Sequence, residues 1–353
     1  MYQLRIRFLS FLVSFLSLSQ ISHGQPSVSE EWYATLDIKK PTIFEYLSGH
    51  SSEELIIEID FELLKEKLYE DEYMPARLFF EGKDKQEVWN IELKARGRFR
   101  RKTCDFPPLK IKFKKKDLDK VGLKEKYNKL KLVTHCKEEF DNQQLVLREY
   151  LVYKLYNKIT DYSFRVRHFK VKWIDAQTEK EIAKQWAFFI ESDEELAKRV
   201  DGDLYEYKLN EDYEFDEENR HLFPLFQYMI GNHDYSLVMA KNLQLIQKDS
   251  DQKIVAVPYD FDYSGVVNAP YKYSDPYLQL SDRRDRKFIG ESLDTELEAS
   301  ISFLNEKENS LIQSIKEFKS LAKRHRTDII NYIEEYFESV SELKVDRPES
   351  KTD

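Results

Sequence analysis

The stretch Pro108-Leu109-Lys110-Ile111-Lys112-Phe113 shows the clearest alternation in the chain. From Leu109 onward, apolar residues occupy every second position and lysines fill the positions between them. Successive side chains of a β-strand point to opposite faces of its sheet. The stretch therefore predicts a strand with an apolar inner face and an outer face that carries Lys110 and Lys112.

The sequence around this strand divides into two halves at Glu191. Before Glu191, strands are expected at 55–59, 74–80, 88–95, 130–133, 164–174 and 186–190, and helices at 61–68 and 141–158. After Glu191, helices are expected at 193–200, 217–230 and 297–340, with short strands at 243–246 and 254–257. A sheet-rich half followed by a helix-rich half predicts an α+β chain with two lobes.

The composition limits the classes of protein to which the chain can belong. It has 353 residues, of which 34% are charged and 14% are aromatic, and its net charge is −9. The length corresponds to about two domains. The aromatic content is too high for a disordered polyelectrolyte. The negative net charge argues against non-specific binding of nucleic acid by the whole protein.

The first 24 residues have the pattern of a secretory signal peptide. Arg5 and Arg7 precede an apolar run at 8–18, and small residues lead up to Gly24. Serines interrupt this run, which is shorter than the ~20 apolar residues of a membrane-spanning helix. We expect cleavage near Gly24 and an exported protein, periplasmic or extracellular, without a transmembrane segment.

Export changes the interpretation of the two cysteines, Cys104 and Cys136. An even pair in an oxidising compartment is able to form one disulfide. Two buried thiols are the alternative, and the spacing does not decide between the two.

Basic residues concentrate around the strand at 108–113. Residues 91–140 contain 17 lysines and arginines against 7 acids. Four of the arginines shortly precede the strand, namely Arg96, Arg98, Arg100 and Arg101. Guanidinium groups bind phosphate oxygens in bidentate pairs, so the cluster fits a polyanion such as a phosphate group. A solvated strand face is the alternative interpretation.

The segment Gly231-Asn232-His233-Asp234 matches one element of the calcineurin-like metallophosphoesterases. Their two metal ions need many nitrogen and oxygen ligands from further histidine motifs. The chain has seven histidines, and only His325 follows His233. The ligand set cannot be assembled, which excludes this class of enzyme.

The same segment fits a phosphotransfer site better. Asp234 lies eight residues before Asn242, and Asp260 and Asp262 follow the strand expected at 254–257. In phosphoryl transfer an aspartate orients the acceptor hydroxyl, while asparagine and aspartate side chains hold a divalent metal. Asp234, Asn242 and Asp260 supply that minimum. Asp262 competes with Asp260 for the metal role.

In these motifs and their order the chain resembles the spore coat protein H (CotH) kinase family. Within it, the chain is most similar to exported CotH-like proteins of Bacteroidetes-type bacteria. The matching motifs are Arg96-Gly97, Pro108 to Phe113, Leu147-Arg148-Glu149, Phe188 to Glu191, Gly231 to Asp234, Asn242 and Pro258 to Asp262. The chain departs from the family pattern at His233, Tyr235 and Lys241.

The resemblance implies an exported atypical kinase that transfers phosphate from ATP to a protein or another envelope component. It implies an atypical protein-kinase-like fold of two lobes. After the signal peptide at 1–24, the chain would divide into a lead-in at 25–50, a sheet-rich N-lobe at 51–191, a helix-rich C-lobe at 192–342 and a polar tail at 343–353. Asp234 becomes the catalytic aspartate.

The remaining roles follow from the same resemblance. Asn242, with Asp260 or Asp262, would hold Mg²⁺ or Mn²⁺. The ATP phosphates would be bound by the residues on the basic side of the site, namely Arg96 with Lys110 or Lys112, and Glu149 would pair with that lysine. The alternative function is a non-catalytic kinase-like module that binds an envelope component, because free ATP is scarce outside the cytoplasm.

Overall fold

The computed structural model describes residues 40–81, 86–97, 100–137, 140–206, 213–272, 278–290 and 295–343. The predicted signal peptide, most of the predicted lead-in and nearly all of the predicted tail lie outside these ranges. The described residues from Pro41 onward form one compact unit.

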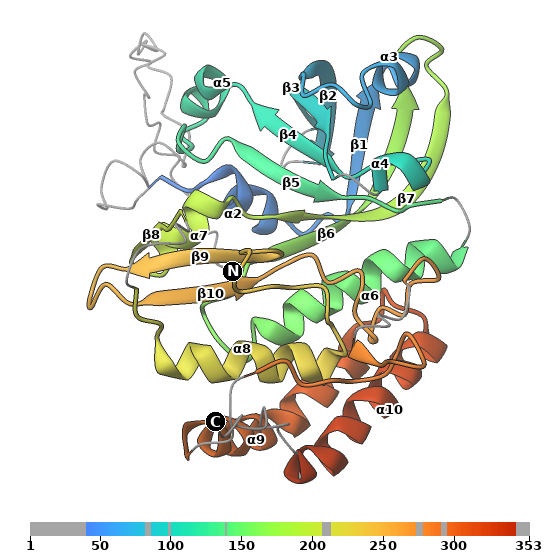
Figure 1. The fold of residues 1–353 in the computed structure, drawn as a ribbon. Helices are drawn as coiled ribbons and strands as arrows, with labels where there is room; N and C mark the ends of the chain where they lie inside the picture. The colour runs from blue at the N-terminus through green and yellow to red at the C-terminus, as the bar shows by residue number, and fades with distance from the viewer. Residues whose placement is uncertain are drawn as a thin grey trace, which may run out of the picture. The chain divides into compact units, whose positions relative to one another are not determined.

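Seven strands close into a barrel (Figure 1). They are β1 (Glu54–Ile59), β2 (Met74–Glu81), β3 (Gln86–Ala95), β4 (Leu109–Phe113), β5 (Lys129–Val133), β6 (Val166–Asp175) and β7 (Glu181–Ile190). The order around the barrel is β1-β2-β3-β4-β5-β7-β6, and β6 returns to β1. β1 and β6 run parallel, and the other neighbouring strands run antiparallel.

This closed barrel shows that the two-lobed, kinase-like fold expected from the sequence is wrong. The barrel closes where β1 pairs with β6, with Ile57 opposite Trp173. Hydrophobic periodicity identifies a strand and its buried face, but it carries no information about which distant strand becomes the neighbour. The closing pair is therefore the contact that the sequence patterns could not reveal.

The inner face of the barrel is apolar, as the alternation of its strands predicts. Leu109, Ile111 and Phe113 of β4 are buried, whereas Lys110 and Lys112 between them are half-buried on the outer face. Ile57 and Trp173 lie in the same core. The prediction for 108–113 is confirmed, and it fixes which side of β4 carries its lysines.

Helices and a small sheet make up the rest of the described chain. Around the barrel lie α2 (Ile43–Ser48), α3 (Phe61–Glu66), α4 (Arg100–Thr103) and α5 (Lys115–Lys120). The others are α6 (Phe140–Tyr156), α7 (Asp193–Arg199), α8 (Glu217–Ile230), α9 (Thr295–Glu317), α10 (Lys323–Ser339) and the short 3₁₀ helix η2 (Val340–Glu342). A three-stranded sheet has the order β10 (Ile254–Pro258), β9 (Leu243–Lys248), β8 (Gly202–Leu204).

The elements from α6 onward surround a second apolar core, to which α6 contributes residues such as Leu147 and Leu151 while it also packs on the barrel (Figure 1). α6 contacts β6 and β7 on one side and α9 on the other. The helix predicted at 297–340 is in fact two helices, α9 and α10. No helix in the described ranges is long and apolar enough to cross a membrane.

The helix α2 lies inside the range predicted as a lead-in, 25–50. Thr42 and Glu45 form a capping box, in which each side chain bonds to the other residue's backbone N–H. Ile43, Phe44 and Leu47 of this helix are buried against the barrel core. The chain therefore joins the compact unit earlier than the sequence patterns indicate.

Candidate functional site

One end of the β9–β10 hairpin brings two of the predicted site residues together. The antiparallel register places Leu243 opposite Pro258. Asn242 comes just before β9, and Asp260 follows shortly after β10. The backbone N–H of Tyr259 donates to the Asn242 carbonyl over 3.0 Å, which ties the two ends to each other.

Asp234 joins this end of the hairpin from the turn after α8. The Asn242 side-chain amide donates to the Asp234 carbonyl over 2.6 Å and to its Oδ2 over 2.9 Å. The Lys241 ammonium donates to the other carboxylate oxygen. The structure thus brings Asp234 and Asn242 into direct contact. Lys241, one of the positions where the chain departs from the family pattern, forms an ion pair with the Asp234 carboxylate.

Asn242 and Asp260 both have left-handed backbones, with φ of 53° and 65°. For a residue other than glycine this conformation is uncommon, and it persists where the surrounding structure enforces it. At Asp260 the enforcing contact comes from α6, because the Asp260 N–H donates to the Tyr153 hydroxyl over 2.9 Å. Asparagine and aspartate adopt this conformation more readily than other residues, and described turn residues such as Gln252 share it, so it is not by itself evidence of a functional site.

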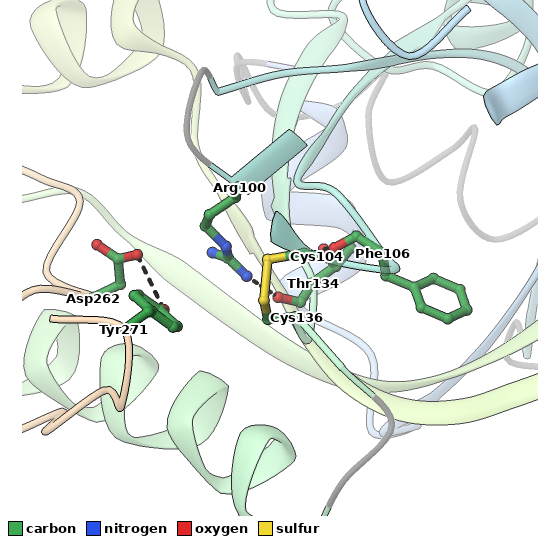
Figure 2. The surroundings of a disulfide bond; sticks show 7 residues. All are labelled: Arg100, Cys104, Phe106, Thr134, Cys136, Asp262 and Tyr271. Atoms are coloured by element: carbon green, nitrogen blue, oxygen red, sulfur yellow. Dashed lines mark hydrogen bonds between the residues drawn. A yellow bond between two sulfur atoms is a disulfide. The ribbon is translucent and has the colours of Figure 1, made fainter. Parts of the chain in front are cut away.

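Two further carboxyls lie buried behind this end of the hairpin. Asp262 and Glu149 of α6 line one small cavity together with Arg100 of α4 and Tyr271. The Tyr271 hydroxyl donates to Asp262 Oδ2 over 3.1 Å (Figure 2). Asp262, Glu149, Arg100 and Tyr271 are called the buried cluster below.

The buried cluster holds two carboxyls beside a single cation. Burial raises the pKa of Asp262 to about 7, and the nearby charge of Asp260 adds to the rise. Burial likewise raises the pKa of Glu149 well above its usual range, and Asp262 adds to it. The positive charge of Arg100 lowers the pKa of both carboxyls. Glu149 Oε1 is buried and accepts no hydrogen bond in the described part of the chain.

A row of lysines crosses three barrel strands on the outer face. In the register, Lys94 of β3 lies opposite Lys110 of β4, and Lys110 lies opposite Lys131 of β5. Like charges directly opposite each other destabilise a sheet. The row therefore concentrates positive charge on one part of the outer face of the barrel.

The lysine row lines a pocket of about 380 Å³, called the basic pocket below. Its lining residues are Tyr69, Asp71, Lys94, Ala95, Arg96, Gly97, Arg101, Lys110 and Lys131. Lys94 pairs with Asp71, and Lys131 pairs with Asp193 over 2.5 Å. No described acid forms an ion pair with Lys110. Several cations around one opening favour a ligand with more than one negative charge.

The basic pocket adjoins the acidic residues. Arg96 lines the pocket, and its positive charge also lowers the pKa of the Glu149 carboxyl. The Lys131 ammonium lies 4.9 Å from the centre of the Tyr259 ring, and Tyr259 directly precedes Asp260. Burial lowers the pKa of Lys131, Arg96 and Lys110 lower it further, and Asp193 opposes them. The basic pocket and the carboxylates are therefore neighbours, linked through Arg96 and through the contact between Lys131 and Tyr259.

The structure separates the two lysines that the sequence left as alternatives. Lys110 lines the basic pocket, whereas Lys112 pairs with Glu92 across the β3–β4 ladder over 2.7 Å. The cation that acts most strongly on Glu149 is Arg100 rather than either lysine. Among the described residues no lysine forms an ion pair with Glu149, and Arg100 is the cation that most lowers its pKa.

Sequence patterns missed four residues of this site as individual contributors, namely Lys94, Arg100, Lys131 and Tyr271. Lys94 and Lys131 occupy outward positions of alternating strands, as Lys110 does, so counting the alternation on neighbouring strands would have found them. Arg100 was recognised only as one member of an arginine cluster. Tyr271 stands out only as part of a loop rich in aromatics, and its contact with Asp262 depends on where that loop is placed.

The acidic residues were tested as a metal site. No three histidine, cysteine, aspartate or glutamate side chains in the described ranges are arranged to hold a metal ion. Mg²⁺ in phosphotransfer sites usually binds one or two carboxylates together with the substrate phosphates, so a complete protein cage is not required. Asn242, Asp260, Asp262 and Glu149 carry oxygen donors of the kind that Mg²⁺ and Mn²⁺ prefer, and a bound phosphate would have to supply the remaining ligands.

We compared the chain with protein-family models and with curated proteins, and neither comparison gave a match. The function is therefore argued from the site itself.

Proposed function

We propose that the protein is an ATP-dependent phosphotransferase that acts on a protein or another envelope component outside the cytoplasm. The observation that carries the proposal is the proximity of the basic pocket to the carboxylates around Asp260. A nucleotide needs cations for its phosphates and carboxylates for the metal ion that accompanies them. Both kinds of group lie close together here.

Each part of the site has a task in this proposal. Lys110, Arg96 and Lys131 bind the phosphate oxygens in the basic pocket. Asp234 orients the acceptor hydroxyl and accepts its proton as the phosphoryl group is transferred. Asp260 and the neighbouring oxygen donors would hold Mg²⁺ or Mn²⁺, which neutralises charge on the phosphates.

Two observations support the proposal from outside the site. The ordered motifs resemble the CotH kinase family. The Cys104–Cys136 disulfide is formed, and such bonds persist in oxidising compartments. Sequencing the N-terminus of the secreted protein tests export: a start just after Gly24 supports it, and an intact Met1 contradicts it.

One observation favours a second candidate, a non-catalytic module that binds a polyanionic envelope component. The Asp234 carboxylate is occupied by Lys241 and Asn242. A catalytic aspartate must give up such contacts to accept a proton from an acceptor. A binding module keeps the basic pocket and has no need for a free Asp234.

Incubation with labelled ATP and Mg²⁺ or Mn²⁺ separates the two candidates. The variants Asp234→Ala and Asp260→Ala should lose about 10²–10⁴ in transfer rate, because each removes a group that acts in the transition state. Asp251→Ala is the matched control, since Asp251 is exposed at the opposite end of the same hairpin and should not affect the rate. If the wild type shows neither metal-dependent ATP binding nor transfer, the binding module is the correct function.

A further inference from the structure

The Cys104–Cys136 disulfide lies beside the buried cluster (Figure 2). Cys104 directly follows α4, and Cys136 follows β5. The Asp105 N–H donates to the Cys136 carbonyl over 2.9 Å, and Cys136 itself lines the small cavity of the cluster. The bond therefore fixes a four-residue helix to the end of a barrel strand.

Arg100 is the residue of α4 that this arrangement positions. Its side chain is buried, and its guanidinium donates to the Thr134 carbonyl, two residues before Cys136. The same guanidinium lies between the disulfide and the Asp262–Tyr271 pair (Figure 2). Among the nearby cations, Arg100 lowers the pKa of Asp262 and of Glu149 most strongly. Its Nε remains buried without a hydrogen bond in the described part of the chain.

A helix as short as α4 does not hold such a position by itself. Isolated helices of a few residues are unstable in water, so their placement depends on tertiary contacts. Burial of an arginine beside carboxylates also requires accurate pairing, because an unpaired buried charge is strongly destabilising. The disulfide is the covalent contact that supplies this placement.

We propose that the Cys104–Cys136 disulfide assembles the nucleotide site by holding Arg100 in the small cavity that it shares with the carboxyls of Asp262 and Glu149. Arg100 acts as a positioning residue, and the site is complete only when the disulfide is formed. The consequence for activity rests on the proposed phosphotransfer, whereas the structural coupling between disulfide and cluster does not.

The chemical step is ordinary thiol–disulfide exchange. During export the Cys104 and Cys136 thiols lose two electrons and two protons to a disulfide oxidant, which is reduced to a dithiol. A dithiol reductant reverses the reaction and returns both thiols. The protein would therefore remain incomplete in the reducing cytoplasm and become competent after export.

Hydrogen exchange measures the structural coupling without any nucleotide. The double variant Cys104→Ser/Cys136→Ser should exchange the backbone amides of 260–272 about tenfold faster than the wild type, because the cluster loses its fixed neighbour. The helices α9 and α10 serve as the internal control and should keep their protection. Unchanged exchange at 260–272 overturns the proposal.

Variants of Arg100 identify the residue through which the disulfide acts. With the disulfide intact, Arg100→Gln should accelerate exchange at 260–272 as the double serine variant does, and Arg100→Lys should restore part of the protection. Lys102→Gln is the matched control, since Lys102 is exposed on the same helix. Combining Arg100→Gln with the serine variants should add little, because both changes remove one contact. Fully additive effects contradict the proposal, and Arg100→Gln alone decides it if the serine variant does not fold.

Binding of Mg·ATP gives the functional readout. The double serine variant and Arg100→Gln should each weaken it by about tenfold, and Lys102→Gln should leave it unchanged. If the wild type does not bind Mg·ATP, the proposed function fails while the exchange experiment still decides the coupling. If the wild type binds and the disulfide-free protein binds equally well, the proposed function survives and the redox dependence is wrong.

Discussion

The basic pocket is lined mainly by cations and the buried cluster contains mainly carboxyls, and the two lie in different surroundings. The pocket is open, and Asp71 and Asp193 pair with two of its lysines. In the buried cluster, Glu149 and Asp262 are only 2% and 6% exposed and share one nearby arginine. Charges interact more strongly in a low-dielectric interior than at a wet surface. Changes to the buried carboxyls should therefore have larger effects than changes to the lysine row.

The largest effect is expected for Asp262→Asn. The variant should lose about 10²–10⁴ in phosphotransfer rate if Asp262 holds the metal. It should also raise the free energy of unfolding at pH 8 by about 1–3 kcal/mol, because it removes a buried, repelled charge. Labelled-ATP transfer and urea unfolding measure the two quantities.

Asp251→Asn serves as the control for this variant, since that aspartate is exposed and should change neither quantity. If Asp262→Asn lowers the free energy of unfolding instead, Asp262 stabilises the fold as the partner of Arg100. In that case the carboxyl is not destabilising as proposed.

A smaller but sharper effect is expected in the pH dependence of the same variant. Because burial raises the pKa of Asp262 to about 7, the folded wild type binds a proton that the unfolded chain releases near pH 4. Stability contributed by this group therefore falls as the pH rises from about 4 to about 7.

The advantage of Asp262→Asn over the wild type should accordingly grow across that window, by at most about 1.4 kcal/mol per pH unit. The comparison reports Asp262 together with Glu149, whose pKa Asp262 also raises. Urea unfolding at pH 4, 5, 6, 7 and 8 measures it. An advantage that stays constant with pH contradicts a raised pKa at Asp262.

The smallest effect is expected in the basic pocket. Lys110→Gln should weaken Mg·ATP binding by about tenfold, which corresponds to one charge-assisted hydrogen bond. It should raise stability by only a few tenths of a kcal/mol, since the repulsion that it relieves is exposed to water. Lys112→Gln is the matched control, because Lys112 pairs with Glu92 outside the pocket. Equal losses for both lysines would mean that the outer face of β4 binds the ligand without selectivity.

The same two regions show what could be predicted from the sequence. Alternation placed Lys110 on the outer face of a strand, and the order of motifs joined Asp234 to Asn242. Both results depend on a local pattern or on residues that lie close together in the sequence. The lysine row depends on the register between three strands, which periodicity on any one strand does not contain.

The buried cluster was harder to predict because it is built from distant segments. Glu149 comes from α6, Arg100 from α4, and Asp262 and Tyr271 from the chain after β10. Their meeting depends on the closure of the barrel and on the disulfide, whose formation the spacing left open. For the same reason, the kinase-like two-lobed fold was a wrong expectation even though most strands and helices were located correctly.

The central claim is that the basic pocket and the carboxylates around Asp260 form one nucleotide site. A crystal structure of the mature protein with Mg²⁺ and a non-hydrolysable ATP analogue tests it most directly. The account predicts phosphate oxygens within hydrogen-bond distance of Lys110 and Arg96, and the metal ion on Asp260 or Asp262. A nucleotide bound elsewhere, or an empty pocket at saturating analogue, would contradict it.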